Sequence, residues 1–389
     1  MEDGRLRVAL VTDWYPPAVG GVEAQVFGLA QALQARGHEV RVFTTSSGTD
    51  EPEPVPTERF PFRSVPGTRI ALPTPGHYRA LRARLAAGRF DVVHAHGMFS
   101  TLAMGGVMAA RSLGIPSVTT HHSLIRLAHL PFARFVYLVA SHRADIVTAV
   151  SAAAARDARR ASGRREVLTL PNGIDIGPLC VAPTMDATGA APAATTAGPI
   201  RVTSVMRLKL KKKPYHLMMD FARVLHRVSD ASRIRFTVVG DGPERARVER
   251  LARVLGIASH VEFAGACTRI EVARILAGSS LFVSPVRAEA FGLALLEARV
   301  AGLPIVAING GGVAEVVEHD RHGLLAATRR EFVDAIVRVI DDEALRRRLA
   351  AGSRDGLARF AWDAVAEQHV DVYRLAIARG GRAPERSAA

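Results

Sequence analysis

The sequence predicts an α/β protein made of two domains, each with a doubly wound parallel sheet. Three observations support this fold class. The chain has 389 residues, 48% of them apolar, whereas a single hydrophobic core stops growing at roughly 250 to 300 residues. Short apolar runs alternate with segments of helical spacing in both halves, as in βαβ units. Residues 178–199 interrupt this pattern with a stretch rich in Ala, Thr, Gly and Pro, which indicates a linker.

The N-terminal domain is expected to cover residues 1–177. Its first apolar run, Val8–Thr12, predicts a buried strand and is followed by a turn-rich stretch at residues 16–21. Apolar residues then recur at helical spacing until Gly37, and Val40–Phe43 predicts the next strand. Further strands of this sheet are predicted at Val92–Val93, Ser117–Thr120, Ile146–Val150 and Val167–Leu170.

The C-terminal domain is expected to cover residues 200–361 and to repeat the alternation. Its strands are predicted at Arg201–Val205, Phe236–Val239, His260–Phe263, Leu281–Ser284 and Ile305–Ala307, with helices near Tyr215–Val228, Pro243–Leu255, Glu271–Ala277 and Leu293–Ala301. Two more helices are predicted at Arg330–Ile340 and Glu343–Ala358. A last helix, residues 362–378, is long enough to cross back to the N-terminal domain, and residues 379–389 are expected to form a tail.

The chain shows no export signal and no membrane-spanning segment. The N-terminus is acidic and its apolar run Val8–Val11 is too short for a signal peptide. The most apolar longer stretch, Leu124–Ala140, is interrupted by charged residues and should not span a bilayer. Cys180 and Cys267 form no CxxC pattern, so neither a disulfide framework nor a metal site is expected. We therefore expect a cytoplasmic protein.

Positive charge is concentrated in one part of the N-terminal domain. Between Arg59 and Ala144 there are eleven arginines and a single acidic residue, Asp91, out of a total net charge of +14. Such a basic region suits phosphates or an anionic membrane surface. A nucleic-acid binder is a further reading of the arginine content. The absence of a G-x-G-x-x-G motif after a strand argues against a dinucleotide-dependent dehydrogenase.

All four lysines of the chain lie within five residues, at Lys209, Lys211, Lys212 and Lys213. A solvated loop is the ordinary explanation for a charge run. Because arginine replaces lysine elsewhere, a compact ammonium group is favoured at this place, and phosphate is the commonest reason for one.

A second candidate site is the segment EAFGLALLE, Glu289–Glu297, which follows a predicted strand and opens a helix. The free amides at a helix start favour an anion, and Gly292 allows close approach of the backbone. Two solvated acids at a helix start would be the ordinary alternative. Gly20 and Gly21, between the first strand and its helix, could likewise approach a ligand or form a simple turn.

Histidines follow two of the predicted strands. His94 and His96 come after the run Asp91–Val93 and should share one face, because side chains alternate along a strand. His121 and His122 follow the strand Ser117–Thr120. Contact with a substrate, a zinc ion or plain packing are all open for the second pair.

Seven motifs occur in order along the chain: PPAVGGVEAQVFGLAQALQARGHEV, DVVHAH, PNGID, MRLKLKK, GDGPE, EAFGLALLE and GGVAEVV. In this order and spacing they resemble glycosyltransferase family 4, retaining enzymes of the GT-B fold, over nearly the whole chain. The resemblance implies two Rossmann-like domains that face a central cleft. It also implies a nucleoside-diphosphate sugar as donor, UDP- or GDP-linked, a hydroxyl acceptor and no obligatory metal or other cofactor.

The resemblance also assigns roles to residues of this sequence. Glu289 and His96 are expected at the reacting sugar, and Glu297 at the ribose hydroxyls. Arg207 and Lys212 match the two cations that bind the diphosphate, although Lys213 stands where glycine is common, so Lys211, Lys212 and Lys213 are partly interchangeable. The remaining expected contacts are Gly20, Gly21, Phe291, Gly292 and Leu293 to the donor, and His121 and His122 to the acceptor.

The region from His96 to His122 is similar to the branch that transfers N-acetylglucosamine to phosphatidylinositol, and more distantly to phosphatidylinositol mannosyltransferases. This resemblance implies an anionic lipid acceptor and peripheral contact with the inner face of the membrane, for which Arg79, Arg82, Arg84, Arg126 and Arg134 are candidates. Nucleic acid is not an expected partner. Alternatives are a soluble acceptor, such as inositol phosphate or a natural product, and a GT-B sugar-nucleotide epimerase. A glycan phosphorylase is disfavoured, because all lysines lie in the diphosphate motif.

Overall fold

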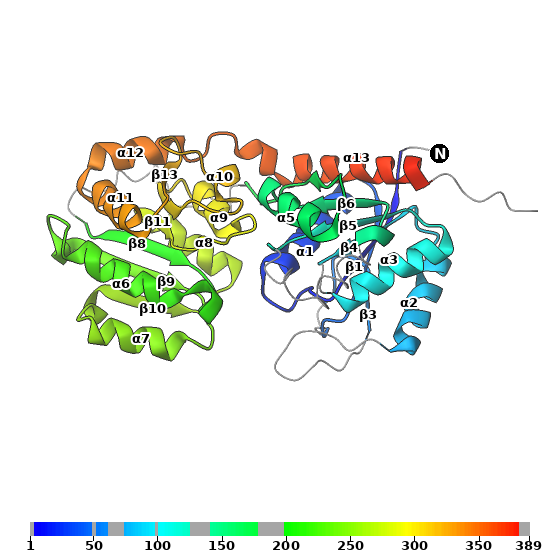
Figure 1. Cartoon of the computed structure of the whole chain (residues 1–389), viewed down its shortest axis with the longest axis horizontal. Coiled ribbons are helices and arrows are strands. Elements are labelled where there is room, and N and C mark those ends of the chain that lie inside the picture. Colours follow the sequence, from blue (N-terminus) through cyan, green and yellow to red (C-terminus); the bar gives the residue numbers. More distant parts are fainter. Residues whose placement is uncertain are drawn as a thin grey trace, which may run out of the picture. The chain divides into compact units, whose positions relative to one another are not determined.

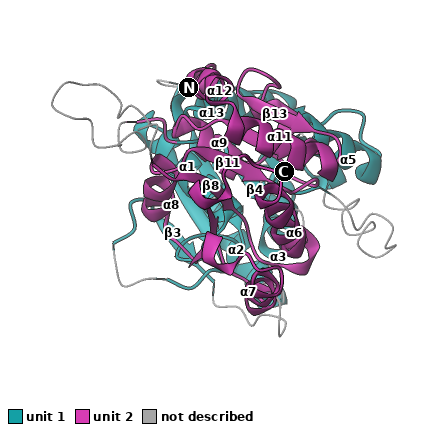
Figure 2. Ribbon diagram, turned by 90° about the vertical axis from the view of Figure 1, so that its left-hand side faces the viewer, with its two compact units in different colours: residues 1–174, 359–389 teal, residues 175–358 magenta. Residues whose placement is uncertain are grey.

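The computed structural model describes residues 4–48, 52–60, 74–97, 100–124, 141–177 and 198–380. The chain forms two compact units, coloured separately in Figure 2. Unit 1 contains residues 1–174 and 359–389, and unit 2 contains residues 175–358. The linker proposed at residues 178–199 falls largely outside the described residues, as do Cys180, Arg126, Arg134 and residues 381–389.

Unit 1 is built on a parallel sheet of seven strands in the order β3-β2-β1-β4-β5-β6-β7. Helices connect most neighbouring strands and cover both faces, as expected for a doubly wound sheet (Figure 1). The elements are β1 Arg7–Thr12, α1 Gly21–Ala35, β2 Glu39–Thr44, β3 Thr57–Arg59, α2 Pro75–Gly88, β4 Val92–His96, α3 Thr101–Leu113, β5 Ser117–His121, β6 Ile146–Ala149, α5 Ala152–Ser162, β7 Leu168–Thr169 and α13 Trp362–Gly380.

Unit 1 buries a separate core on each face of its sheet. Val8 and Leu10 of β1 pack with α1 and α13, while Ala9 and Val11 pack with α2 and α3. Successive side chains of a strand point to opposite faces, so a central strand covered on both sides is apolar throughout. This explains why the β1 segment is a continuous apolar run.

The last helix, α13, packs against α1, β4 and β5 of unit 1. Its first residue, Trp362, fills the space that two glycines leave. A Cβ at Gly28 would lie 2.0 Å from the Trp362 ring, and one at Gly173 would lie 2.3 Å from it. Ile174 also forms a β-bridge with Ala361. The entrance of α13 is thus held against α1 and the end of the first chain segment.

Unit 2 contains a parallel sheet of six strands in the order β10-β9-β8-β11-β12-β13. Its core joins the sheet to α6, α7, α11 and α12. The elements are β8 Ile200–Val205, α6 Pro214–Leu225, β9 Ile234–Val239, α7 Arg245–Val254, β10 Val261–Gly265, α8 Arg269–Ala277, β11 Leu281–Ser284, α9 Leu293–Val300, β12 Ile305–Ile308, α10 Val313–Val316, β13 Gly323–Ala326, α11 Arg329–Asp341 and α12 Glu343–Gly352.

The predicted α/β fold class with two parallel sheets is confirmed. All predicted strands are present, and only the short strands β3 and β13 were not predicted. One placement was wrong, because His94 and His96 lie within β4 rather than after it. The strand extends to His96 since its neighbours β1 and β5 continue to pair there, with Thr12 and Thr120 as partners of His96.

Candidate functional site

In unit 2, residues predicted to bind the donor follow two neighbouring strands. The strand order places β8 beside β11, with β9 and β10 on one side and β12 and β13 on the other. Ligands of doubly wound sheets bind at such a switch point, beyond the carboxyl ends of the strands. Arg207 and Lys212 follow β8, and Glu289 follows β11. The topology therefore brings together segments that are far apart in the sequence.

Arg207 lies on a backbone segment that the GDGPE motif supports. A Cβ at Gly240 would lie 2.1 Å from the Met206 carbonyl oxygen, and one at Gly242 would lie 2.3 Å from that of Leu208. Both glycines have a positive φ, +122° and +159°. Only glycine combines this backbone conformation with such close approach. The motif thereby fixes the chain on both sides of Arg207, which is exposed.

Lys212 and Glu289 form an ion pair at the switch point. Lys212 Nζ lies 2.8 Å from Glu289 Oε2, and the two side chains are 25% and 27% exposed. Lys212 ends a short 3-10 turn and Lys213 follows in the left-handed conformation, with a φ of 51°. Lys211 and Lys213 are exposed. Of the three lysines that the sequence motif left open, Lys212 is the one that contacts Glu289.

Helix α9 begins immediately after this pair. Gly292 precedes Leu293 in the left-handed conformation, with a φ of +101°. In the part of the chain that the structure describes, no side chain caps this helix start. Its first amides keep their hydrogen-bonding capacity and their partial positive charge, which suits an anionic group. Phe291 is buried and Leu293 is half-buried beside them.

A triple-glycine loop after β12 holds the backbone of Glu289. The Gly312 N–H donates to the Glu289 carbonyl oxygen at 2.9 Å. A Cβ at Gly311, whose φ is +62°, would lie 1.8 Å from the same oxygen. A Cβ at Gly310 would lie 2.2 Å from the Arg287 carbonyl oxygen. The GGVAEVV motif is therefore explained by close packing against the segment that carries Glu289.

Glu297 is a half-buried carboxylate in α9. Desolvation raises its pKa, and the Arg269 guanidinium opposes this rise in part. Within the described residues, no hydrogen bond or ion pair to the carboxylate is found. A desolvated acceptor of this kind can bind hydroxyl groups of a ligand, because each hydroxyl donates a hydrogen bond.

In unit 1, the corresponding switch point lies between β1 and β4. The connection after β1 carries Gly20 and Gly21, while His96 ends β4. Gly20 has an extended backbone, with φ 175° and ψ 172°. Any residue adopts this conformation, so the backbone there does not by itself require glycine. Gly21 is the first residue of α1.

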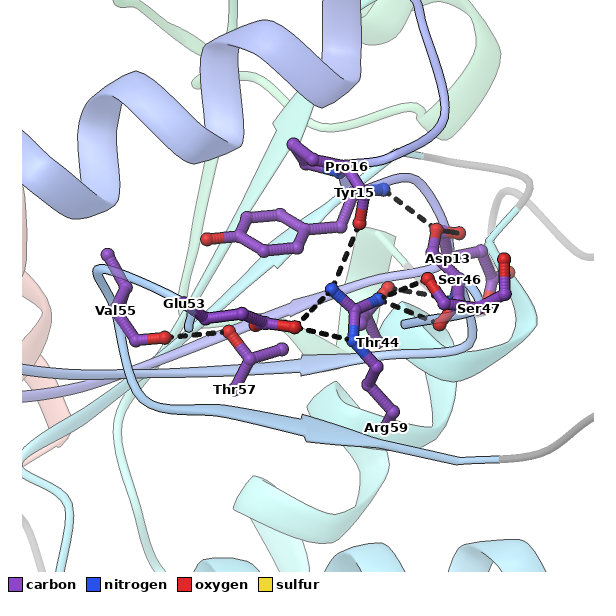
Figure 3. A network of polar contacts seen from close by, with 10 residues as sticks. All are labelled: Asp13, Tyr15, Pro16, Thr44, Ser46, Ser47, Glu53, Val55, Thr57 and Arg59. Atoms are coloured by element: carbon purple, nitrogen blue, oxygen red, sulfur yellow. Dashed lines mark hydrogen bonds and ion pairs between the residues drawn. The ribbon is translucent and has the colours of Figure 1, made fainter. Parts of the chain in front are cut away.

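Arg59 holds the loop between β1 and α1 from the neighbouring strand β3 (Figure 3). Its guanidinium donates to the carbonyl oxygens of Pro16, Ser46 and Ser47 and to the carboxylate of Glu53, at 2.7 to 3.0 Å. Arg59 is the first arginine of the basic region, and these bonds engage it within the unit.

Asp13 anchors the start of the same loop. Its carboxylate accepts from the Thr101 N–H at 2.8 Å, at the start of α3, and from the Thr45 hydroxyl at 3.0 Å. Burial raises the pKa of the Asp13 carboxyl, whereas its hydrogen bonds, first among them one from Ser100, lower it. The loop that leads to Gly20 is therefore fixed at both of its faces.

His96 is the central residue of a group of buried imidazoles. Its Nδ1 lies 3.1 Å from His122 Nε2, and its ring centroid lies 3.9 Å from that of His94. The His96 side chain is buried, and its Nε2 has no hydrogen-bond partner among the described residues. Burial, followed by the positive charge that His94 and other nearby imidazoles would carry, holds the pKa of His96 well below its usual range. The ring is neutral at physiological pH.

The two histidines predicted to meet the acceptor have different surroundings. His122 is half-buried and paired with His96, and burial lowers its pKa to about 3. His121 is the last residue of β5 and is buried, which lowers its pKa to about 4. In the described residues, no three His, Cys, Asp or Glu side chains are arranged to hold a metal ion. No described helix is both long and apolar enough to cross a bilayer.

Similarity to known proteins decides the family. Residues 19–177 match the model described as Glycosyltransferase Family 4, and residues 192–355 match Glycosyl transferases group 1. A phosphatidylinositol N-acetylglucosaminyltransferase protein of Arabidopsis thaliana is 30% identical over 351 residues, covering 87% of this chain and 75% of that protein. The chain belongs to glycosyltransferase family 4. It is a transferase.

Further similarities agree with this glycosyltransferase assignment. A D-inositol 3-phosphate glycosyltransferase of Stackebrandtia nassauensis is 29% identical, covering 99% of this chain and 95% of that protein. The structure of Anabaena HepE in complex with UDP and glucose has a TM-score of 0.77 at 22% identity, and covers 95% of this chain and all of that one. The last similarity bears on the fold, which is the GT-B fold that the sequence motifs predicted.

Two supporting features of this glycosyltransferase escaped the sequence reasoning. The GGVAEVV and GDGPE motifs were noticed, but their contacts with the backbone of Glu289 and around Arg207 were not foreseen, since backbone contacts leave no signal in side-chain patterns. His94 was noticed only as a neighbour of His96. Its partners, Thr120 and Tyr373, lie 26 and 279 residues away. Nothing in the local sequence points to them.

Proposed function

We propose that this glycosyltransferase moves a hexose or N-acetylhexosamine from a UDP- or GDP-sugar to a hydroxyl of a phosphorylated inositol carried on a lipid, with retention of configuration. The observation that carries the proposal is the Lys212–Glu289 pair, 2.8 Å apart, beside the uncapped start of α9. A cation and free helix amides suit the diphosphate, and an adjacent carboxylate suits the sugar hydroxyls.

The proposed chemistry depends on stabilising the leaving group. Arg207, Lys212 and the α9 amides offset the charge that develops on the departing nucleoside diphosphate. Glu289 orients the donor sugar, and Glu297 accepts hydrogen bonds from the ribose hydroxyls. Phe291, Gly292 and Leu293 line the same donor contact, and Gly20 and Gly21 approach the donor from unit 1. Charged donors fixed by the fold need no reorganisation during reaction.

In this proposal, His96 presents its Nε2 to a hydroxyl of the reacting sugar as the bond to the diphosphate weakens. The transition state resembles an oxocarbenium ion, as in other glycosidic bond reactions. None of the assigned residues is placed as a covalent nucleophile. We therefore favour front-face attack, in which the departing diphosphate helps to deprotonate the acceptor hydroxyl. His121 and His122 are the proposed contacts toward the acceptor.

The choice of acceptor rests on the relatives. One is named for phosphatidylinositol and the other for inositol phosphate, so a phosphorylated inositol is their common element. A lipid-borne form is favoured by exposed arginines on α2, Arg79, Arg82 and Arg84. Anionic lipid attracts such side chains. Arg84 also pairs with Glu58 at 3.4 Å, an exposed contact that lipid can replace.

The proposal can be tested in two steps. Thermal shift with UDP-, GDP- and ADP-sugars should select one donor, because a ligand that binds the folded state alone raises its stability. The chosen donor is then incubated with phosphatidylinositol vesicles, with soluble inositol phosphate, or without acceptor. We expect a glycolipid product that keeps the anomeric configuration of the donor. A product from inositol phosphate alone would refute the lipid acceptor, and an epimerised donor would refute transfer.

Membrane contact is tested by co-sedimentation with phosphatidylinositol or phosphatidylglycerol vesicles at low salt. Exchange of Arg79, Arg82 and Arg84 for alanine should reduce binding. The matched control exchanges three exposed arginines on α7 of unit 2, Arg247, Arg250 and Arg253. Equal binding by both variants, or no binding by the wild type, would exclude α2 as the docking surface.

A further inference from the structure

The C-terminal helix α13 contributes two side chains to the histidine group beneath the end of β4. Tyr373 and His369 of α13 are both buried. The Tyr373 hydroxyl lies 2.8 Å from His94 Nδ1. The rings of His369 and His94 have centroids 5.7 Å apart. The last helix of the chain therefore reaches the residue on which His96 stacks.

Four polar groups form a continuous hydrogen-bonded chain inside unit 1. His94 Nε2 lies 2.7 Å from Thr120 Oγ1, which lies 2.5 Å from Thr148 Oγ1. The Thr148 hydroxyl donates to the Thr119 carbonyl oxygen at 3.4 Å. With the Tyr373 contact, both ring nitrogens of His94 have a partner. The chain begins at α13, crosses β4 and β5, and ends at β6.

The direction of each hydrogen bond follows from the end of this chain. A carbonyl oxygen only accepts, so the Thr148 hydroxyl uses its single proton there. The Thr120 hydroxyl then donates to Thr148, and the His94 Nε2–H donates to Thr120. His94 Nδ1 is left without a proton and accepts from the Tyr373 hydroxyl. One tautomer of His94 therefore satisfies every member.

His94 is in turn the platform for His96. The ring centroids are 3.9 Å apart, with an interplanar angle of 38°. On its outer side, His96 Nδ1 meets His122 Nε2 at 3.1 Å. These contacts leave His96 Nε2 as the buried ring atom that has no partner among the described residues. Any rotation of His94 would remove the surface that sets the plane of His96.

We infer that Tyr373 is a positioning residue of the transfer reaction, which acts through His94 to fix the ring plane of His96. This inference rests on the proposed function, in which His96 Nε2 meets the donor sugar. The Tyr373 hydroxyl selects the His94 tautomer, and the threonine hydroxyls hold the opposite edge of the ring. Thus α13 orients a group at the reacting centre in addition to covering the sheet.

The test compares Tyr373→Phe with Tyr78→Phe. Tyr373→Phe removes one hydroxyl and leaves the ring, so the core keeps its volume. Loss of a group that orients a site residue typically lowers activity roughly 10-fold to 100-fold. We expect a loss of this size in kcat, with the donor KM within about twofold, since the diphosphate contacts belong to unit 2. Tyr78→Phe, on the half-buried part of α2, should change neither.

Two further measurements separate positioning from packing. Nitrogen-15 NMR of labelled histidines should show the Nε2–H tautomer of His94 in the wild type, and a changed Nδ1 resonance in Tyr373→Phe. His94→Phe should lower kcat to a similar extent, and the double variant should be no worse than either single one. Unchanged kcat and unchanged Nδ1 resonance in a folded Tyr373→Phe protein would overturn the inference, as would additive losses.

Thr120→Val interrupts the same chain at its other end and serves if Tyr373→Phe does not fold. We expect a similar loss of kcat, and wild-type kcat in a folded Thr120→Val protein would also contradict the inference. His96→Ala distinguishes this failure from that of the proposed function. Wild-type turnover in His96→Ala would remove the assumed role of His96. Loss in His96→Ala with wild-type turnover in Tyr373→Phe would refute the positioning role alone.

Discussion

At the scale of single residues, the Lys212–Glu289 pair contributes to binding more than to stability. Each side chain is about one quarter exposed. Ion pairs open to solvent contribute up to about 1 kcal/mol, because water screens their attraction and both side chains lose conformational freedom. The backbone around the pair is instead held by glycine contacts, at Gly311 for Glu289. The fold can therefore lose the Lys212 ammonium without losing its structure.

Lys212→Ala should reduce kcat/KM by roughly 100-fold to 1,000-fold, the usual cost of removing a group that stabilises charge in the transition state. Its unfolding free energy should fall by less than about 1 kcal/mol. Lys211→Ala, one residue earlier and exposed, is the control and should keep near wild-type activity. Steady-state kinetics and urea denaturation provide both measurements. The reverse ranking of the two variants would show that Lys211 serves the diphosphate.

At the scale of elements, glycine-rich loops place the groups of the site. The loops after β9 and β12 each pack glycines against the carbonyl oxygens of a neighbouring loop. Such contacts fix the backbone of the residues that precede α6 and α9. Arg207 and Glu289 are therefore positioned by backbone that belongs to other connections of the same sheet.

The matched substitutions Gly311→Ala and Gly256→Ala test this support. Both glycines have a positive φ, +62° and +70°, so alanine costs each about 1–2 kcal/mol of backbone strain. At Gly311 the new Cβ would also lie 1.8 Å from the Glu289 oxygen, whereas no atom lies within 4 Å at Gly256. We expect Gly311→Ala to lose at least tenfold in turnover and Gly256→Ala to lose stability alone. Equal turnover in both, measured well below the unfolding temperature, would contradict this role of the loop.

At the scale of the whole molecule, buried histidines make unit 1 sensitive to acid. Burial lowers the pKa of His121 and His369 to about 4, that of His122 to about 3, and those of His94 and His96 well below 6.5. The unfolded chain then binds protons more readily than the folded unit. Stability is present above pH 6.5 and is lost as the pH falls toward the folded-state pKa values.

Between pH 7 and pH 5, each such histidine should lower the unfolding free energy by on the order of 1–2 kcal/mol. Both tryptophans of the chain, Trp14 and Trp362, belong to unit 1, so their fluorescence reports its unfolding, while far-UV circular dichroism reports both units. We expect the fluorescence midpoint to fall more steeply with pH than the dichroism signal of unit 2. His369→Phe should reduce the slope, and His226→Gln, an exposed control, should not. A slope that is the same for both units would disprove the explanation.

The fold was largely predictable from the sequence, because its buried strands are continuous apolar runs such as Val8–Thr12. The short strands β3 and β13, of three and four residues, carry too little pattern to be distinguished from loops. Motif spacing led to Lys212 and Glu289, and the structure shows that they touch. The contact of Gly311 with a carbonyl oxygen and the bond between His94 and Tyr373 depend on tertiary structure, so no local pattern announces them.

The return of α13 to unit 1 bears on how the chain can fold during synthesis. Val370, Tyr373 and Ala376 belong to the same core as Val8 and Leu10. When the ribosome has released the first 174 residues, that core still lacks one wall, and the imidazole of His94 lacks its tyrosine partner. Unit 2 becomes complete as soon as residue 358 has emerged. Although domains generally fold from the N-terminus onward, here the second unit can be finished first, and the first must wait for the last helix.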